Sequence, residues 1–194
     1  MKVLQMTNSI LASQIRSERG KGAIGFHQDR ISGLRDLLWN AKDMRVLDIG
    51  TNRGLVAFEF ARHGAALVHG CDIYEAGLNA AREIFTEVEI PSQFEVVDLT
   101  EGPVALERAF GKQYLARYDI VLFLGIYHKL KEQVSEHVVF ELVRHLVDRT
   151  ERFFVVRTTM IDALAPCLGS AGLWKVHFSA LSPFVGPLEI WSRT

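Results

Sequence analysis

Residues 46–54 read VLDIGTNRG, and this stretch decides how the chain is expected to fold. A short apolar run ends at Asp48, and Gly50 and Gly54 then bracket a turn with Asn52 midway between them. This order is typical of a buried β-strand that leads into a helix, where a glycine lets the backbone approach a ligand closely because no Cβ intervenes. A dinucleotide-binding turn would read GxGxxG, and that spacing is absent. The stretch therefore predicts either an unusual ligand loop or a plain strand-to-helix turn.

Similar apolar runs recur along the chain and alternate with segments of helical periodicity. This alternation predicts an α/β fold whose strands are covered on both faces. The last two runs are separated only by a short Pro- and Gly-containing link at 182–186, which is typical of an antiparallel hairpin. The seven predicted strands are RVLDIG, ALVHGCDI, QFEVVDL, YDIVLFLG, RFFVVRTT, KVHFSAL and PLEIWSR.

The predicted helices lie between these strands, and the first forty residues form a segment of their own. We expect an N-terminal helical cap or flap at 1–40 and the main domain at 41–194. A Gly-rich link, RGKGAIG, joins the two helices of the N-terminal segment. The predicted helices are 9–16, 28–39, 55–63, 75–87, 103–110, 131–148 and 161–168.

Composition excludes several classes of protein. The chain has 194 residues, of which 48% are hydrophobic, and its net charge of −1 provides no global field that would gather nucleic acid. Its two cysteines lie far apart and its seven histidines show no metal-binding spacing, so we expect no metal site. No run approaches the roughly 18 apolar residues of a membrane helix. These features predict a soluble, cytoplasmic protein.

Acidic residues end the first three predicted strands. Asp72 follows Asp48 by 24 residues, and Asp98 ends the third strand. Because parallel strands end at the same sheet edge, these side chains are expected to face one site. Asp72 would accept hydrogen bonds from both ribose hydroxyls of a nucleoside, and Asp98 would accept one from the amine of adenine while the Leu99 N–H reaches a ring nitrogen. Ile73 would pack on the adenine face. Each acid has an alternative as a turn cap or a solvated strand end.

These stretches together resemble the class I S-adenosylmethionine-dependent methyltransferases. VLDIGTNRG resembles their glycine-rich first motif, GCDIY their ribose motif and EVVDL their adenine motif, and YDIVLFLGIYHKL resembles the strand after which substrate and cofactor meet. The resemblance covers residues 44–194 and implies a Rossmann-like, doubly wound fold with S-adenosylmethionine as cofactor. It implies that the first turn holds the amino-acid end of the cofactor and that a backbone carbonyl lies near its amine. The residues so implicated are Asp48, Gly50, Asn52 and Gly54 in the turn, and Leu124 or Gly125 for the carbonyl.

The segment after the fourth strand supplies the candidate catalytic residues. Methyl transfer is an in-line displacement that depends mainly on alignment and desolvation, but a hydroxyl acceptor also needs a base. His128 is the candidate base, since imidazole titrates near neutral pH, and its alternative is a helix cap. Tyr127 would shape the acceptor pocket or pack as a core aromatic. Lys129 would be solvated or would pair with an anionic acceptor.

The sequence leaves the identity of the methyl acceptor open. The chain lacks the Asn/Asp-Pro-Pro-aromatic tetrad of many base-amine and glutamine methylases, so we expect a small or medium acceptor methylated on oxygen. The alternatives are an RNA methyltransferase of tRNA type, which the charge does not favour, and a non-catalytic S-adenosylmethionine-binding regulatory module. The stretch RGKGAIGFHQDR is either a mobile flap or an ordinary loop, and its basic residues suit an anionic acceptor or a solvated face. The oligomeric state is not indicated.

Overall fold

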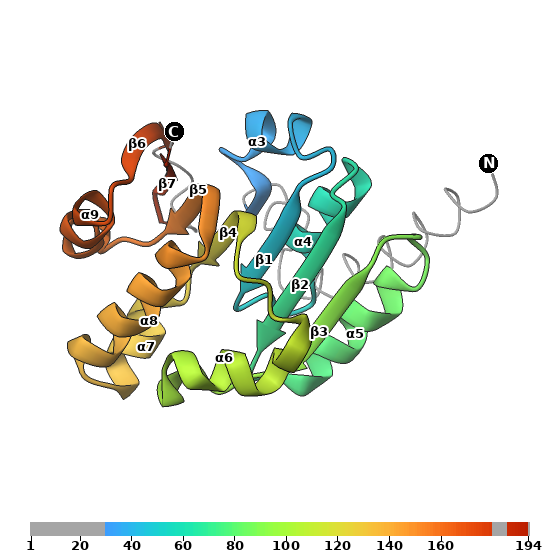
Figure 1. Cartoon of the computed structure of the whole chain (residues 1–194), viewed down its shortest axis with the longest axis horizontal. Helices are drawn as coiled ribbons and strands as arrows, with labels where there is room; N and C mark the ends of the chain where they lie inside the picture. Colours follow the sequence, from blue (N-terminus) through green and yellow to red (C-terminus); the bar gives the residue numbers. More distant parts are fainter. Residues whose placement is uncertain (1–29, 180–185, 194) are drawn as a thin grey trace.

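One seven-stranded sheet organises the residues that the computed structural model describes, 30–179 and 186–193 (Figure 1). Its strand order is β3-β2-β1-β4-β5-β7-β6. This confirms the predicted seven-stranded fold. The strands are β1 (Arg45–Ile49), β2 (Leu67–Asp72), β3 (Ser92–Val96), β4 (Tyr118–Leu124), β5 (Thr150–Arg157), β6 (Trp174–Ser179) and β7 (Leu188–Ser192).

The first five strands run parallel, and of the last two only β7 runs in the opposite direction. β1 lies between β2 and β4 and pairs with both in parallel, while β7 pairs antiparallel with both β5 and β6. The predicted terminal hairpin is therefore present. Its second strand, β7, lies between its first strand, β6, and the parallel strand β5. The chain leaves β1 toward β2 and later returns to β4 on the other side, so the C-terminal ends of β1 and β4 form the topological switch point of the sheet.

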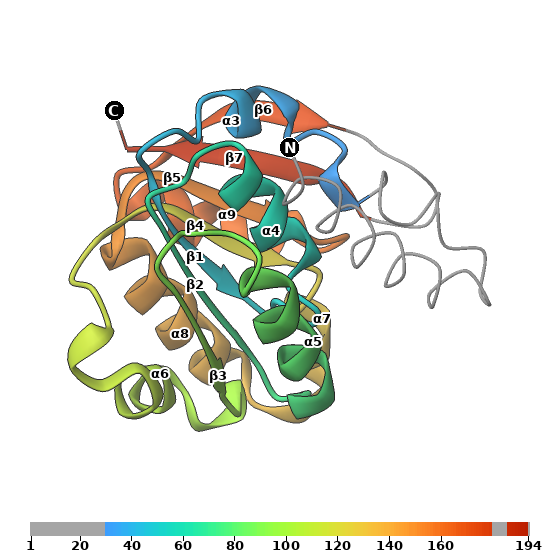
Figure 2. The same cartoon turned by 90° about the vertical axis from the view of Figure 1, so that its right-hand side faces the viewer.

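Helices cover both faces of the sheet, as expected for strands that are apolar on both sides (Figure 2). The core of one face is formed with α3 (Arg35–Trp39), α4 (Leu55–Arg62) and α5 (Glu75–Phe85). The core of the other face is formed with α6 (Pro103–Phe110), α7 (Tyr127–Gln133), α8 (Glu136–Asp148) and α9 (Ile161–Ser170). Two 3₁₀ turns complete the described part, η2 (Leu99–Glu101) and η3 (Gly111–Gln113).

Two predicted helices are interrupted. The helix expected at 131–148 is two helices, because Val134 is extended and Ser135 begins α8 as its N-terminal cap residue. In the described part of 28–39, Gly33 has φ 80° and breaks the helix before α3. Leu34, nevertheless, is fully buried in the core, so this segment packs against the sheet. The helix expected at 9–16 and the stretch 19–29 lie outside the described residues.

Within the described ranges, no helix combines the length and the apolar character that a bilayer crossing requires.

Candidate functional site

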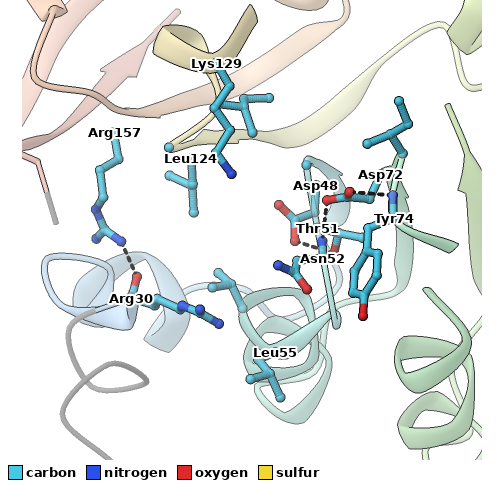
Figure 3. A pocket seen from close by; sticks show the side chains of 15 residues that line it. Arg30, Asp48, Thr51, Asn52, Leu55, Asp72, Tyr74, Leu124, Lys129 and Arg157 are labelled. Atoms are coloured by element: carbon cyan, nitrogen blue, oxygen red, sulfur yellow. Dashed lines mark hydrogen bonds between the residues drawn. The ribbon is translucent and has the colours of Figure 1, made fainter. Parts of the chain in front are cut away.

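A cavity of about 460 Å³ opens at the switch point of the sheet (Figure 3). A volume of this size lies in the range typical of small-molecule sites. Residues from the ends of β1, β2, β4 and β5 line it, together with Arg30 from the segment before α3. The predicted cofactor residues that line it are Asp48, Gly50, Asn52, Asp72, Ile73, Leu124 and Gly125.

The turn after β1 is built on left-handed backbone. Gly50 has φ 77°, and a Cβ at this position would lie 2.4 Å from Cγ2 of Ile126, so only glycine fits. Asn52 has φ 52°, a conformation that asparagine adopts more readily than most residues. The Asn52 N–H donates to Oδ2 of Asp72 at 2.8 Å. The asparagine therefore preserves the turn and ties it to the end of the next strand.

Asp72 joins two loops at the edge of the cavity. Its Oδ2 accepts from the turn after β1, and its Oδ1 accepts from the Tyr74 N–H at 2.9 Å. A carboxylate has about four acceptor positions, so these two bonds leave capacity for a ligand hydroxyl. Ile73 and Tyr74 are exposed by 63% and 50% and line the cavity beside it. Exposed apolar surface next to a polar acceptor suits a ligand with a flat, apolar face.

Asp48 is the buried acid of the site, and only 3% of this residue is exposed to solvent. Its Oδ2 accepts from the Thr51 hydroxyl at 2.7 Å. Burial raises the Asp48 pKa to about 7; the Thr51 hydrogen bond opposes this shift and the nearby charge of Asp72 adds to it. The carboxyl therefore titrates near neutral pH, and a cationic group of a ligand beside it would favour its ionised form.

Basic side chains line the opposite side of the cavity from these acids (Figure 3). Arg157, at the end of β5, is 4% exposed, and its guanidinium donates to the backbone carbonyls of Arg30 and Ser32 at 2.6 and 2.7 Å. Lys129 of α7 directs its side chain into the cavity. Arg157 is not among the residues predicted from the sequence; a cation directly after the apolar run at 153–156 was the available signal.

Three of the predicted cofactor residues lie away from this cavity lining. Gly54 has φ 70°, and a Cβ there would lie 2.8 Å from the Ala81 Cβ, so it allows α4 and α5 to approach closely. Asp98 caps η2, since its Oδ1 accepts from the Thr100 N–H and hydroxyl at 2.9 and 2.6 Å. These bonds hold the pKa of Asp98 below its usual range. Leu99 belongs to the core.

The two candidate catalytic residues also lie away from the lining. Tyr127 is fully buried in the core on the face covered by α6 to α9, the position expected of a packing aromatic. His128 is exposed. Lys129 is the residue of this group that lines the cavity, together with Ile126 at the start of α7.

Comparisons with known proteins place this geometry in a family. A family model described as a methyltransferase domain matches residues 46–149. No curated protein matches the chain. Magnesium protoporphyrin IX methyltransferase from Synechocystis, solved with bound S-adenosylmethionine, is 20% identical, with 89% of this chain and 81% of that chain covered and a TM-score of 0.68.

Two further solved structures share the fold. A TehB-like S-adenosylmethionine-dependent methyltransferase from Corynebacterium glutamicum is 15% identical, covers 93% of this chain and 94% of its own, and has a TM-score of 0.61. A putative RNA methyltransferase from Pyrococcus horikoshii is 12% identical, with 82% and 79% covered and a TM-score of 0.58. At such identities the likeness concerns the fold and not the acceptor.

The family model spans more than half of the chain, so the chain belongs to the methyltransferase domain family. It is an S-adenosylmethionine-dependent methyltransferase with a Rossmann-like fold. The residues of the cavity fit this methyl donor: a glycine cradle after β1, an acceptor carboxylate on Asp72 and exposed apolar surface at Ile73.

Proposed function

We propose that the chain transfers a methyl group from S-adenosylmethionine to an oxygen atom of a small or medium acceptor. The observation that carries this proposal is the convergence of Asp48, Asp72 and the β4 end at Gly125 on one cavity of about 460 Å³. A cavity of this size suits a cofactor and a small acceptor rather than an extended polymer.

In this proposal the acidic side of the cavity holds the cofactor. Asp72 accepts from the ribose hydroxyls, and Ile73 covers one face of the adenine, with Tyr74 beside it. The turn at Gly50 and Asn52 and the buried Asp48 hold the amino-acid end, with a backbone carbonyl of Leu124 or Gly125 toward the amine. The turn between β1 and α4, where Gly54 is the cap residue of α4, supports this cradle.

The adenine edge is the part of the proposal that depends on residues outside the lining. Asp98 would accept from the exocyclic amine and the Leu99 N–H would donate to a ring nitrogen. The Asp98 carboxylate already accepts two hydrogen bonds on Oδ1, which fixes its orientation. Asp98→Ala should weaken binding of S-adenosylhomocysteine more than binding of its inosine analogue, which lacks the amine; equal losses would assign Asp98 to capping alone.

The protein's own contribution to the reaction is mainly positioning and exclusion of water. The bound donor supplies a sulfonium methyl group, which is already electrophilic. The residues at the β4 end place the acceptor oxygen in line with it, and the low polarity around buried Asp48 strengthens charge interactions there. A hydroxyl acceptor would also need a base, for which His128 is the candidate, whereas an acceptor oxygen that is already anionic needs none.

The test is an acceptor screen that measures release of S-adenosylhomocysteine over sugars, nucleotides, phenols, carboxylates and tRNA, with calorimetric binding of S-adenosylhomocysteine as the reference. Turnover with a small acceptor and methylation on oxygen would support the proposal. Turnover with tRNA alone would favour an RNA methyltransferase. Binding of S-adenosylhomocysteine without turnover on any acceptor would favour a non-catalytic module.

His128→Ala in the same screen measures whether a base is needed. Loss of turnover with unchanged affinity for S-adenosylhomocysteine would assign His128 as the base for a hydroxyl acceptor. Unchanged turnover would remove it from the chemistry. The exposed position of His128 makes the variant a safe one for folding.

A further inference from the structure

The two sides of the cavity carry side chains of opposite charge, and this arrangement indicates which kind of acceptor the cavity can bind. Asp48 and Asp72 line one side, while Arg30, Lys129 and Arg157 line the other (Figure 3). Asp72 accepts from two backbone N–H groups at the β1 and β2 loops, so the acidic side is fixed in place. An anion entering such a cavity is repelled by one wall and attracted by the other, which gives it a single orientation.

The basic side is also a built structure and not a chance grouping of surface charges. Arg157 is buried, and its two hydrogen bonds to the carbonyls of residues 30 and 32 fix the segment that carries the Arg30 side chain. Lys129 is displayed on α7, in the first turn after β4, and forms no ion pair among the described residues. Its ammonium group points into the cavity (Figure 3).

Resting on the methyl transfer proposed above, we infer that the acceptor is an oxyanion, a carboxylate or a phosphate, held by Lys129 and Arg30 and methylated on its own anionic oxygen. Arg157 is a positioning residue, because it acts through the backbone of residues 30–32. Among the described residues no histidine lines the cavity. An anionic acceptor oxygen needs no such base, because it attacks the methyl carbon without losing a proton.

The chemical balance is simple for such an acceptor. An electron pair of the anionic oxygen forms the new bond to the methyl carbon, and the bond between that carbon and sulfur breaks. The broken bond's electron pair returns to sulfur, so a sulfonium and an oxyanion give a thioether and a methyl ester, and no proton moves. Opposite charges disappear in this step, and a cavity that excludes water favours such a loss of charge.

The matched variants lie on one helix. Lys129→Met removes the charge and keeps most of the stem, Lys129→Arg restores a cation, and Lys131→Met is the control. Lys131 lies on the same helix but pairs with Glu136 at 3.0 Å and does not line the cavity. Each variant is checked for folding by circular dichroism and for binding of S-adenosylhomocysteine by calorimetry.

The acceptors tested are benzoate, phenyl phosphate and the uncharged benzyl alcohol, together with the small-molecule pool of the native cells separated by anion exchange. We expect turnover with the retained, anionic fraction, with a KM that rises about tenfold in Lys129→Met, recovers in Lys129→Arg and is unchanged in Lys131→Met. Release of methanol on alkaline treatment identifies a carboxyl methyl ester, and a shifted ³¹P resonance identifies a phosphate methyl ester.

Several results would overturn the inference. Activity confined to the unretained, uncharged fraction would do so, as would a loss of turnover in His128→Ala with cofactor affinity intact. A tenfold loss of affinity for S-adenosylhomocysteine in Lys129→Met would assign the lysine to the cofactor's own carboxylate. Failure of the wild-type protein to bind S-adenosylhomocysteine would instead count against the proposed function itself. Binding of S-adenosylhomocysteine without turnover in either fraction would reject both the proposal of a small acceptor and the inference that this acceptor is anionic.

Discussion

Asp48 shows how one residue links the stability of the protein to its site. Its carboxyl is buried with one hydroxyl donor, Thr51, and its pKa is raised to about 7. A group whose folded-state pKa lies above its unfolded value binds more protons when folded, so ionising it costs stability as pH rises. Such a cost is typical of functional positions, where a buried charge is kept for the ligand that will pair with it.

The pH dependence of Asp48 can be measured directly. Between about pH 4, the unfolded value, and pH 7, each pH unit should lower the free energy of unfolding by up to about 1.4 kcal/mol through this group. Asp48→Asn keeps the shape and the acceptor for Thr51 but removes the titration. The variant should therefore be more stable than the wild type at pH 8 and should lose this advantage as pH falls to 5. Urea unfolding of both proteins from pH 5 to 8 gives the difference; a constant difference across this range would contradict the raised pKa.

At the scale of elements, the end of β5 fixes the segment before α3. Arg157 donates to two carbonyls of this segment, and α3 itself packs in the core through Leu37 and Leu38. Removing a buried donor leaves both carbonyls without this partner, which typically costs about 1–3 kcal/mol. The first turn of the described segment should loosen before the rest of the domain does.

Arg157→Met should therefore increase hydrogen exchange of the peptide that covers residues 30–38 by about tenfold or more. Arg157→Lys should restore part of the protection, because one donor remains. Arg152→Met, on the exposed part of the same strand, is the control and should leave this peptide unchanged. Unchanged protection in Arg157→Met would show that core packing alone holds the segment.

The sequence predicted the sheet and the acidic side of the cavity because both follow from strand ends. Asp48 and Asp72 end parallel strands, and parallel strands end at one edge whatever the side chains between them. No such rule indicated which of the consecutive residues Tyr127, His128 and Lys129 would face the cavity. Consecutive residues of a helix point about 100° apart, so the packing of Tyr127 in the core decides that Lys129 lines the cavity. Likewise, only local hydrogen bonds show that Asp98 serves as a cap.

At the scale of the whole molecule, the cavity lies where both helical layers meet one sheet. Its lining includes Leu55 of α4 from one core and Ile126, packed against the other core, just before α7. Gly50 packs against Ile126, so the first turn touches the element after β4 directly. A ligand bound here contacts both cores at once, and its binding free energy should stabilise the described domain as one cooperative unit.

Binding of S-adenosylhomocysteine should raise the melting temperature of the entire protein in a single transition. At a concentration one hundred times its Kd the ligand adds about 2.7 kcal/mol, which for a chain of this size corresponds to a shift of roughly 5–10 °C. Asp72→Ala removes the proposed ribose acceptor and two hydrogen bonds that tie the loops together, so its shift at the same concentration should be much smaller. Glu75→Ala, an exposed acid at the start of α5, should keep the full shift. Scanning calorimetry with and without ligand measures all three; a split transition would mean that the ligand stabilises only one side of the sheet, and no shift in the wild type would contradict the site.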